Sequence, residues 1–264
     1  PRMTWWQKGW MAAAVNLSDI AAMGAQPLGL LLAMGLPRHL EEKDVREMVQ
    51  GAADCCDTYG TEYLGGDTKE CSELALTGTS LGLVPKSGLL TRKGARPGDL
   101  LLMTGTAGLA FAGLLALEND IHSEKALKSL FEPRPRVKEG TLISSSGKVT
   151  ACMDTSDGLP ISLHELGEAG AVSFEVDAAA VPVDPEVLRL AKIADKDPQE
   201  IALQGGGDYQ LLFTVRPEGL DEVLNALGDE AKVIGRCIEG KRNILKRGRS
   251  RKELEPMGYE HFRR

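Results

Sequence analysis

The longest nearly uninterrupted apolar stretch of the chain, Leu28 to Leu36, limits the folds that this sequence can adopt. It is about half as long as the roughly 20 residues that a membrane-spanning helix needs, so it predicts a buried strand. With 264 residues, 42% of them apolar, the chain can bury a substantial core. Its length favours two domains of ordinary size over one large domain.

Helical and strand-like patterns are mixed along the whole chain. We expect a helix over 6–25, ended by Pro27, and an amphipathic helix over 42–59, where apolar residues recur every three or four positions. Hairpin-like pairs of strands favour an α+β fold with antiparallel or mixed sheets over a doubly wound parallel sheet. The other predicted strands cover residues 74–84, 100–104, 149–154, 172–177, 211–215, 232–237 and 243–246. Further helices are predicted over 159–169 and 185–194, after the glycine loop that begins GTAGLAFAGLLAL, before EPRPRVKEG, from Asp197-Pro198 onward, and after the strand at 211–215.

The segment RKGARPGD, residues 92–99, is rich in turn formers and charge, and we place a domain boundary there. It divides the chain into an N-terminal domain, residues 1–91, and a C-terminal domain, residues 92–264. The net charge of −7 argues against nucleic acid or an anionic membrane as a partner, because both need a positive field. Five cysteines without a C-x-x-C pair argue against a disulfide framework and a zinc site, and they favour a reducing, cytoplasmic location.

Four acids follow strongly apolar segments and are flanked by glycine or serine. They are Asp19 in NLSDI, Asp67 in YLGGDTKE, and Asp154 and Asp157 in MDTSDGL. Taken singly, Asp19 or Asp157 is explained as a helix cap or a structural ion pair, and Gly-Gly-Asp as a turn. As a set, these oxygen donors without histidine or cysteine favour Mg²⁺, and magnesium held by aspartates usually implies a phosphate substrate.

Several cations could complement a phosphate, although each is also explained as a solvated surface charge: Lys69, Arg92, Arg134 and Arg136. The familiar nucleotide signatures are missing from the sequence, both the P-loop and a G-x-G-x-x-G after a strand. TGTAGLA, residues 104–110, could offer backbone amides to a phosphate, but a glycine turn is the simpler interpretation. The four histidines lie outside the acid motifs and no nucleophile elbow occurs, so zinc hydrolases and triad enzymes fit poorly.

Seven motifs in order cover nearly the whole chain: VNLSDIAAMGAQPLG, GGDT, LTRKGARPGDLLLMTG, EPRPRV, MDTSDGL, GGGDYQLLFTV and MGYEHF. In these motifs the sequence resembles the thiamine-monophosphate kinases, a family related to aminoimidazole ribonucleotide synthetase. The resemblance implies an aminoimidazole-ribonucleotide-synthetase-like fold of two domains, with the N-terminal domain forming a β-barrel across a homodimer and a C-terminal α/β domain with a mixed sheet. It also implies an ATP site between the domains and Mg²⁺-dependent transfer of the γ-phosphoryl group to thiamine monophosphate.

Carried over by motif, the resemblance also implies roles for individual residues. The expected Mg²⁺ ligands are Asp19, Asp67, Asp154 and Asp157. The residues expected along ATP are Tyr59, Gly66, Asp67, Arg92 and Ser156, and those expected at the thiamine moiety are Gly207 and Tyr259. No catalytic residue beyond these metal and nucleotide ligands is implied.

The chain departs from the family at GGGDYQ, residues 205–210, where the family commonly has GGEDYE and thus two more carboxylates. The family's early Asp-Asp metal loop and its histidine-bearing strand are expected upstream of Pro1. Two alternatives stay open. One is another ATP-dependent enzyme of the superfamily, such as a selenophosphate synthetase, an amidine-forming synthetase or a hydrogenase-maturation factor, and the other is a non-catalytic nucleotide-binding or dimerisation module.

Overall fold

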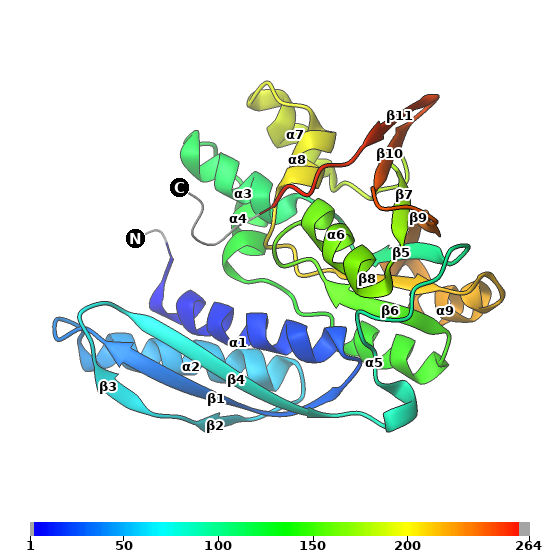
Figure 1. The fold of residues 1–264 in the computed structure, drawn as a ribbon. Helices are drawn as coiled ribbons and strands as arrows, with labels where there is room; N and C mark the ends of the chain where they lie inside the picture. The colour runs from blue at the N-terminus through cyan, green and yellow to red at the C-terminus, as the bar shows by residue number, and fades with distance from the viewer. Residues whose placement is uncertain (1–2, 259–264) are drawn as a thin grey trace.

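The computed structural model describes residues 3–258, which form two β-sheets with helices packed on their faces (Figure 1). The strands are β1 Gln26–Leu36, β2 Tyr63–Gly65, β3 Thr68–Glu70, β4 Ala75–Leu83, β5 Leu100–Thr104, β6 Val149–Asp154, β7 Ser173–Asp177, β8 Leu211–Val215, β9 Ala231–Ile238, β10 Ile244–Arg247 and β11 Ser250–Glu253. The α-helices are α1 Trp5–Ala22, α2 Glu42–Thr58, α3 Leu109–Glu118, α4 Glu124–Phe131, α5 Val137–Ser146, α6 Leu159–Gly170, α7 Pro185–Ile193, α8 Pro198–Gln204 and α9 Leu220–Leu227.

The first sheet contains β1 to β4 and has mixed pairing. β1 pairs in parallel with β2 and β3 along one edge and antiparallel with β4 along the other. Helices α1 and α2 cover one face of this sheet, and α1 lies between the sheet and the C-terminal half of the chain (Figure 1). The residues of β4 alternate between exposed and half-buried, which leaves the other face of the sheet open to solvent in the single chain.

The second sheet has seven strands in the order β11-β10-β7-β9-β5-β8-β6. Its neighbouring strands pair antiparallel except β10 and β7, which are parallel. Both sheets therefore confirm the expected mixed pairing. Within residues 3–258 no helix is both long enough and apolar enough to cross a membrane.

Helix α1 belongs to a core that both sheets share. Leu17 of α1 packs in one cluster with Leu30 of β1 and Leu211 of β8. Successive residues of a strand point to opposite faces, so Leu212 of β8 packs instead in a second cluster with Leu163 of α6. The second sheet is thus covered on both faces, and α1 joins the two halves of the chain through apolar contact.

The boundaries of the first helix and strand differ from the prediction. The helix ends at Ala22 instead of residue 25, because Gly24 adopts a left-handed conformation with φ of 69° and turns the chain. Pro27 lies inside β1, next to a register shift between Pro27 and Gly29, where a strand tolerates the missing amide donor. The sequence analysis did not predict α5 or the short strands β2, β3 and β11.

Candidate functional site

Three of the four singled-out acids lie at the boundary between the two halves of the chain. Asp19 is in the last turn of α1, Asp154 ends β6, and Asp157 lies in the loop that follows. Burial, followed by the charges of these three carboxylates, raises the pKa of the Tyr209 phenol to about 12. The three acids therefore lie within electrostatic reach of one side chain, although they come from separate parts of the sequence.

The structure contradicts the helix-capping interpretation of both Asp19 and Asp157. Asp19 lies within α1, whose N-cap is Thr4. Asp157 precedes α6, but the N-cap of α6 is Gly158, and no side chain caps this helix. The two carboxylates need another explanation.

Asp19 and Asp154 line a cavity of about 400 Å³. Arg92, from the segment where the domain boundary was expected, lines the same cavity, and most of the remaining wall is apolar. The other lining residues are Ala22, Met23, Leu90, Thr91, Cys152 and Met153. The cavity thus combines carboxylates, one guanidinium group and an apolar wall, which suits a ligand with a charged and an uncharged part.

Asp154 is the buried member of the group and is held from the other half of the chain. Its side chain accepts a hydrogen bond at Oδ2 from Ser18 Oγ of α1, at 2.5 Å. Burial raises the pKa of Asp154 to about 6, and the charge of Asp19 raises it too, while the Ser18 hydrogen bond and Arg92 act in the opposite direction. Burial also raises the pKa of Asp19, again opposed by Arg92.

The negative charge of this group is only partly compensated by the protein. Arg92 donates a hydrogen bond at 2.8 Å to Glu165, so its charge is shared with an acid outside the group. Among residues 3–258, neither the Asp19 nor the Asp157 carboxylate has a side-chain hydrogen bond or ion pair. A cation from solution or a positively charged complex would remove this imbalance.

A second loop, Gly205–Gly207, packs directly on the loop that carries Ser156 and Asp157. Gly207 donates a backbone hydrogen bond to the Ser156 carbonyl oxygen at 2.8 Å. A Cβ atom on Gly206 would lie 2.6 Å from that same oxygen, so no side chain fits there. Gly207 itself has φ of 93°, a conformation that favours glycine. The glycine run therefore allows the two loops to touch through their backbones.

The glycine-rich loop before α3 is not a free phosphate site. Asp208 accepts hydrogen bonds from the backbone amides of Gly108 and Ala110, at 2.5 and 2.9 Å. Burial raises the pKa of Asp208 to about 6, although these amides, which favour the charged form, act against the shift. The start of α3 is already occupied by a carboxylate of the same chain, so the simpler interpretation of TGTAGLA as a structural turn holds.

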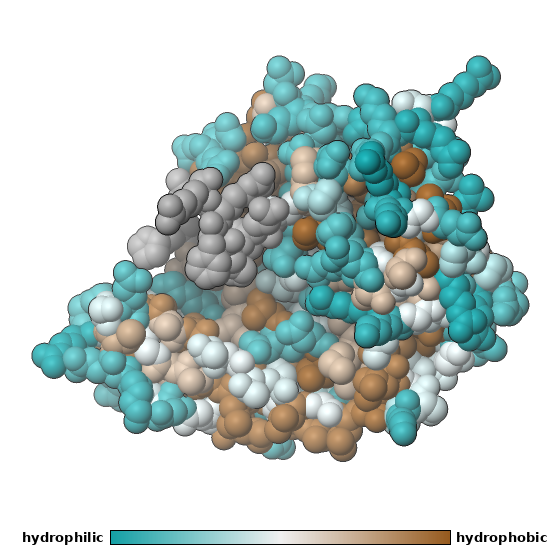
Figure 2. All heavy atoms as spheres, viewed as in Figure 1, coloured by the Kyte–Doolittle hydropathy of each residue, from teal (hydrophilic) through white to brown (hydrophobic). Residues whose placement is uncertain are grey.

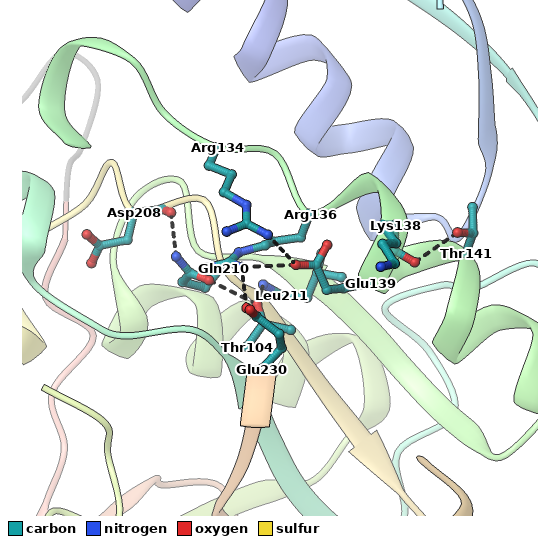
Figure 3. A network of polar contacts seen from close by, with 10 residues as sticks. All are labelled: Thr104, Arg134, Arg136, Lys138, Glu139, Thr141, Asp208, Gln210, Leu211 and Glu230. Atoms are coloured by element: carbon teal, nitrogen blue, oxygen red, sulfur yellow. Dashed lines mark hydrogen bonds and ion pairs between the residues drawn. The ribbon is translucent and has the colours of Figure 1, made fainter. Parts of the chain in front are cut away.

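The buried network in Figure 3 explains how Gln210 fits where the family commonly has glutamate. Its side chain accepts a hydrogen bond from Thr104 Oγ1 at 3.0 Å and donates one to the Asp208 carbonyl oxygen at 3.0 Å (Figure 3). The nearby buried guanidinium of Arg136 pairs with Glu139 at 3.0 Å and with Glu230 at 2.9 Å. Two carboxylates thus already pair with Arg136, so its charge does not require a third acid at position 210, although its buried Nε atom has no hydrogen-bond partner among the described residues.

Gly66 and Asp67 lie away from the acids at the domain boundary. Asp67 stands between β2 and β3, its carboxylate is 66% exposed, and Lys69 lies 3.4 Å away. Its backbone pairs with Met34 near the far end of β1. Ile20, next to Asp19, packs instead over Gly82 of β4, which is paired with Pro27 near the start of β1. At about 3.3 Å per residue, this puts roughly 20 Å between Asp67 and Asp19 along the strand. The structure does not bring Asp67 to the other acids of its own chain.

Tyr59 lies on another side of α1. Its ring meets the Trp10 ring edge to face, with centroids 6.4 Å apart. Burial raises the pKa of Tyr59 to about 12, while the charges of Arg134 and Arg136 lower it. Trp10 also donates a hydrogen bond to the Pro133 carbonyl oxygen, so it links Tyr59 to the EPRPRV motif. Tyr259, expected at the substrate, lies outside the described residues.

Two residues of this site were not singled out from the sequence. Ser18 could have been found as the polar neighbour of Asp19 on an otherwise apolar helix. Tyr209 gave no such signal, because nothing in the local sequence indicates its φ of 49°, an uncommon conformation for a residue with a side chain. It stands between Asp208 and Gln210, both engaged in hydrogen bonds, and within electrostatic reach of the three acids.

The oxygen donors fit a metal ion that the substrate completes. Residues 3–258 contain no group of three or more histidine, cysteine, aspartate or glutamate side chains placed to hold a metal ion by themselves. Mg²⁺ commonly uses one or two carboxylates together with water and phosphate oxygens. Asp19 and Asp154, on the wall of one cavity, supply such a pair. Two carboxylates suit a Mg²⁺ ion that binds together with a phosphate ligand. A metal ion bound permanently by the protein alone would need more ligands.

Comparison with known proteins gives a consistent family and fold. Family models match residues 1–84, as AIR synthase related protein, N-terminal domain, and residues 96–247, as the C-terminal domain of the same family. Thiamine-monophosphate kinase from Methanospirillum hungatei is 41% identical over 259 residues, which are 98% of this chain and 82% of that protein. The solved structure of AaThiL complexed with AMPPCP and TMP has 29% identity and a TM-score of 0.89, covering 99% of this chain and 82% of that one. The hydrogenase maturation protein HypE in complex with ATP shares the fold, with a TM-score of 0.80 at 19% identity, over 96% of this chain and 79% of that one.

Proposed function

The chain belongs to the AIR synthase related family and, within it, to the thiamine-monophosphate kinases; from this we propose that it transfers the γ-phosphoryl group of ATP to thiamine monophosphate. The products are thiamine diphosphate and ADP, so the protein is a phosphotransferase of thiamine diphosphate biosynthesis. The observation that carries the proposal is the pair Asp19 and Asp154 on the wall of one cavity that Arg92 also lines, with Asp157 in the loop that follows β6.

This group of side chains suits a reaction that needs charge neutralisation more than proton transfer. The attacking oxygen belongs to the phosphate of thiamine monophosphate and is already anionic near neutral pH, so it needs no general base. It forms a bond to the γ-phosphorus while the bond to the bridging oxygen of ADP breaks, and ADP leaves as an anion. The protein has to hold two polyanions in line and reduce their repulsion.

We assign the residues at the domain boundary to these tasks. Asp19, Asp154 and Asp157 would hold Mg²⁺, which supplies positive charge next to the transferring phosphoryl group when bound. Arg92 and Ser156 would contact ATP, with Tyr59 further along it. Gly207 and the segment that contains Tyr259 would contact the thiamine moiety. Because position 207 has no side chain, that contact would use the backbone where the family commonly has a carboxylate.

We also propose that the chain works as a homodimer through the open face of its first sheet. This face carries exposed leucines from three strands, and Figure 2 shows an apolar surface along the lower edge, where Figure 1 has β1, β2 and β4. The exposed leucines are Leu28, Leu31, Leu64, Leu81 and Leu83. Pairing with the same face of a second copy would remove them from water and bring eight strands together as a barrel across the dimer.

In the proposed dimer, Asp67 can take part in catalysis at the site of the other subunit. In its own chain Asp67 is exposed and about 20 Å along the strand direction from Asp19. It lies at the edge of the sheet that faces the second copy. We therefore assign Gly66 and Asp67 to the nucleotide and Mg²⁺ site of the other subunit.

Mixing two inactive variants tests both the reaction and this arrangement. Asp19→Asn and Asp67→Asn are purified separately, then mixed under conditions of subunit exchange, and ATP-dependent formation of thiamine diphosphate is measured. If Asp67 serves the other subunit, a mixed dimer keeps one intact site, and a random mixture recovers about a quarter of the wild-type rate. A mixture that stays inactive would show that Asp67 acts in its own chain. A wild-type protein that forms no thiamine diphosphate would refute the proposed function itself.

The proposal also includes a domain boundary and a cellular location. We keep the domain boundary near Arg92, which falls between the residues that the two family models match. We place the enzyme in the cytoplasm, because its five cysteines are free and Cys55, Cys56, Cys152 and Cys237 are buried, as expected in a reducing compartment.

A further inference from the structure

One hydrogen bond joins the two halves of the chain beside the acids. Ser18 Oγ of α1 donates to Asp154 Oδ2 of β6 at 2.5 Å, and the two residues are 0% and 5% exposed. The hydrogen bond is short and has a carboxylate acceptor, the type that is about twice as strong as a bond between neutral groups. Ser18 is adjacent to Asp19 in the sequence, so the bond lies next to a second member of the acid group.

This bond divides the Asp154 carboxylate into an oxygen held by Ser18 and one that is free of side-chain hydrogen bonds. Oδ2 is bound by Ser18, whereas Oδ1 accepts no side-chain hydrogen bond among residues 3–258 and is not one of their fully buried atoms without a partner. Asp154 also lines the cavity of about 400 Å³. The free oxygen is therefore the one available to a ligand in that cavity.

The position of the bond on α1 adds to its effect. Two other hydrogen bonds connect α1 to the C-terminal half, from Gln7 to Glu132 and from Trp10 to the Pro133 carbonyl oxygen. Both are at the N-terminal end of the helix, at least two turns from Ser18. At the acid end, among the described residues, the Ser18 hydrogen bond is the polar contact that fixes α1 against β6.

We propose that Ser18 is a positioning residue, which sets the orientation of the Asp154 carboxylate and its spacing from Asp19 across the domain boundary. The inference rests on the proposed function, in which these two acids hold Mg²⁺. Without the hydroxyl, Asp154 loses the donor that orients it, and the last turns of α1 lose their polar contact with β6. Loss of such a supporting partner typically lowers metal affinity by about 10-fold to 100-fold.

The test compares Ser18→Ala with Ser144→Ala. Ser144 is a matched control, because it is also a buried serine on a helix, and its Oγ donates to the Gly88 carbonyl oxygen at 2.7 Å, with no acid involved. Mn²⁺ binding is measured by electron paramagnetic resonance with a non-hydrolysable ATP analogue present. We expect S18A to bind Mn²⁺ about 10-fold more weakly than wild type, S144A to bind it normally, and Ser18→Thr, which keeps the hydroxyl, to recover part of the loss.

Hydrogen–deuterium exchange without metal gives an independent measurement. We expect S18A to increase exchange in residues 15–22 and 150–156, while S144A leaves these segments unchanged. Equal Mn²⁺ affinity and equal exchange in a folded S18A protein and in wild type would overturn the inference. If the wild type itself binds no Mn²⁺, the proposed metal site is refuted. That outcome differs from equal Mn²⁺ binding by wild type and S18A, which overturns only the role of Ser18.

Discussion

Replacing Gly206 by alanine should disable the enzyme while leaving it folded. A Cβ atom at this position would lie 2.6 Å from the Ser156 carbonyl oxygen and 2.9 Å from the Asp157 carbonyl carbon. An ordinary contact begins at 3.4 Å, so the first distance falls short by about 0.8 Å. Both contacted atoms belong to the backbone and cannot rotate away. The loop that carries Ser156 and Asp157 must therefore move.

The size of this displacement sets the expected effect. Overpacking of this kind costs about 2 kcal/mol, which lowers the melting temperature of a chain of this size by roughly 4–8 °C. A displacement near 1 Å at a reacting centre can reduce the rate about 100-fold. We therefore expect Gly206→Ala to remain folded at 25 °C but to lose about two orders of magnitude in kcat/KM.

Gly170→Ala is the matched control. Gly170 is the last residue of α6, and a Cβ there would meet its nearest neighbour at 3.4 Å, an ordinary contact. Thermal unfolding by circular dichroism and ADP release in the presence of thiamine monophosphate measure the two effects. A G206A protein with wild-type kcat/KM and melting temperature would refute the view that contact between these two loops builds the reaction site.

Three further predictions address the buried charges and the dimer. Burial raises the pKa of Asp208 to about 6, above its value of about 3.9 in an unfolded chain. The folded protein thus binds this proton more tightly, and the unfolding free energy of wild type relative to Asp208→Asn should rise by about 1.4 kcal/mol between pH 7 and pH 5; urea denaturation that gives the same difference at both values would contradict this. Arg136→Met leaves Glu139 and Glu230 without their buried partner and should cost about 3–5 kcal/mol in urea denaturation, whereas Arg38→Ala, at an exposed ion pair, should cost less than about 1 kcal/mol. Leu81→Lys, on the open face of the first sheet, should yield monomers in sedimentation equilibrium, whereas Leu188→Lys on α7 should not, although the two leucines are 53% and 50% exposed.

The spacing of apolar and turn-forming residues predicted most helices and strands, because these elements depend mainly on their local sequence. The strand at 100–104 and the strand at 211–215 have the predicted bounds, since each is a short apolar run between turn-forming residues. The short strands β2 and β3 were missed, because they exist only through pairing with β1. Long-range pairing of three residues leaves little mark on the local sequence.

The acids of the site were found as residue types, but their arrangement required the fold. Asp19, Asp154 and Asp157 could be singled out because each lies in a short motif where an apolar segment meets serine or glycine. Their meeting depends on α1 packing against the end of β6, a contact between residues more than a hundred positions apart. Asp67 has the same local pattern and lies elsewhere. Sequence pattern could not distinguish these two outcomes, because it does not encode which strand ends become neighbours.

The shared packing of α1 limits how this enzyme can be recombined with its relatives. A chimaera joined near Arg92 would keep both sheets intact and still pair Leu17 of one parent with Leu211 of the other, inside one core. The point where the two parental sequences are joined is thus not the place where the two halves of the structure pack against each other. A functional hybrid would have to inherit the side of α1 that contacts β6 and β8 from the parent that donates those strands, even though the helix precedes them by more than a hundred residues.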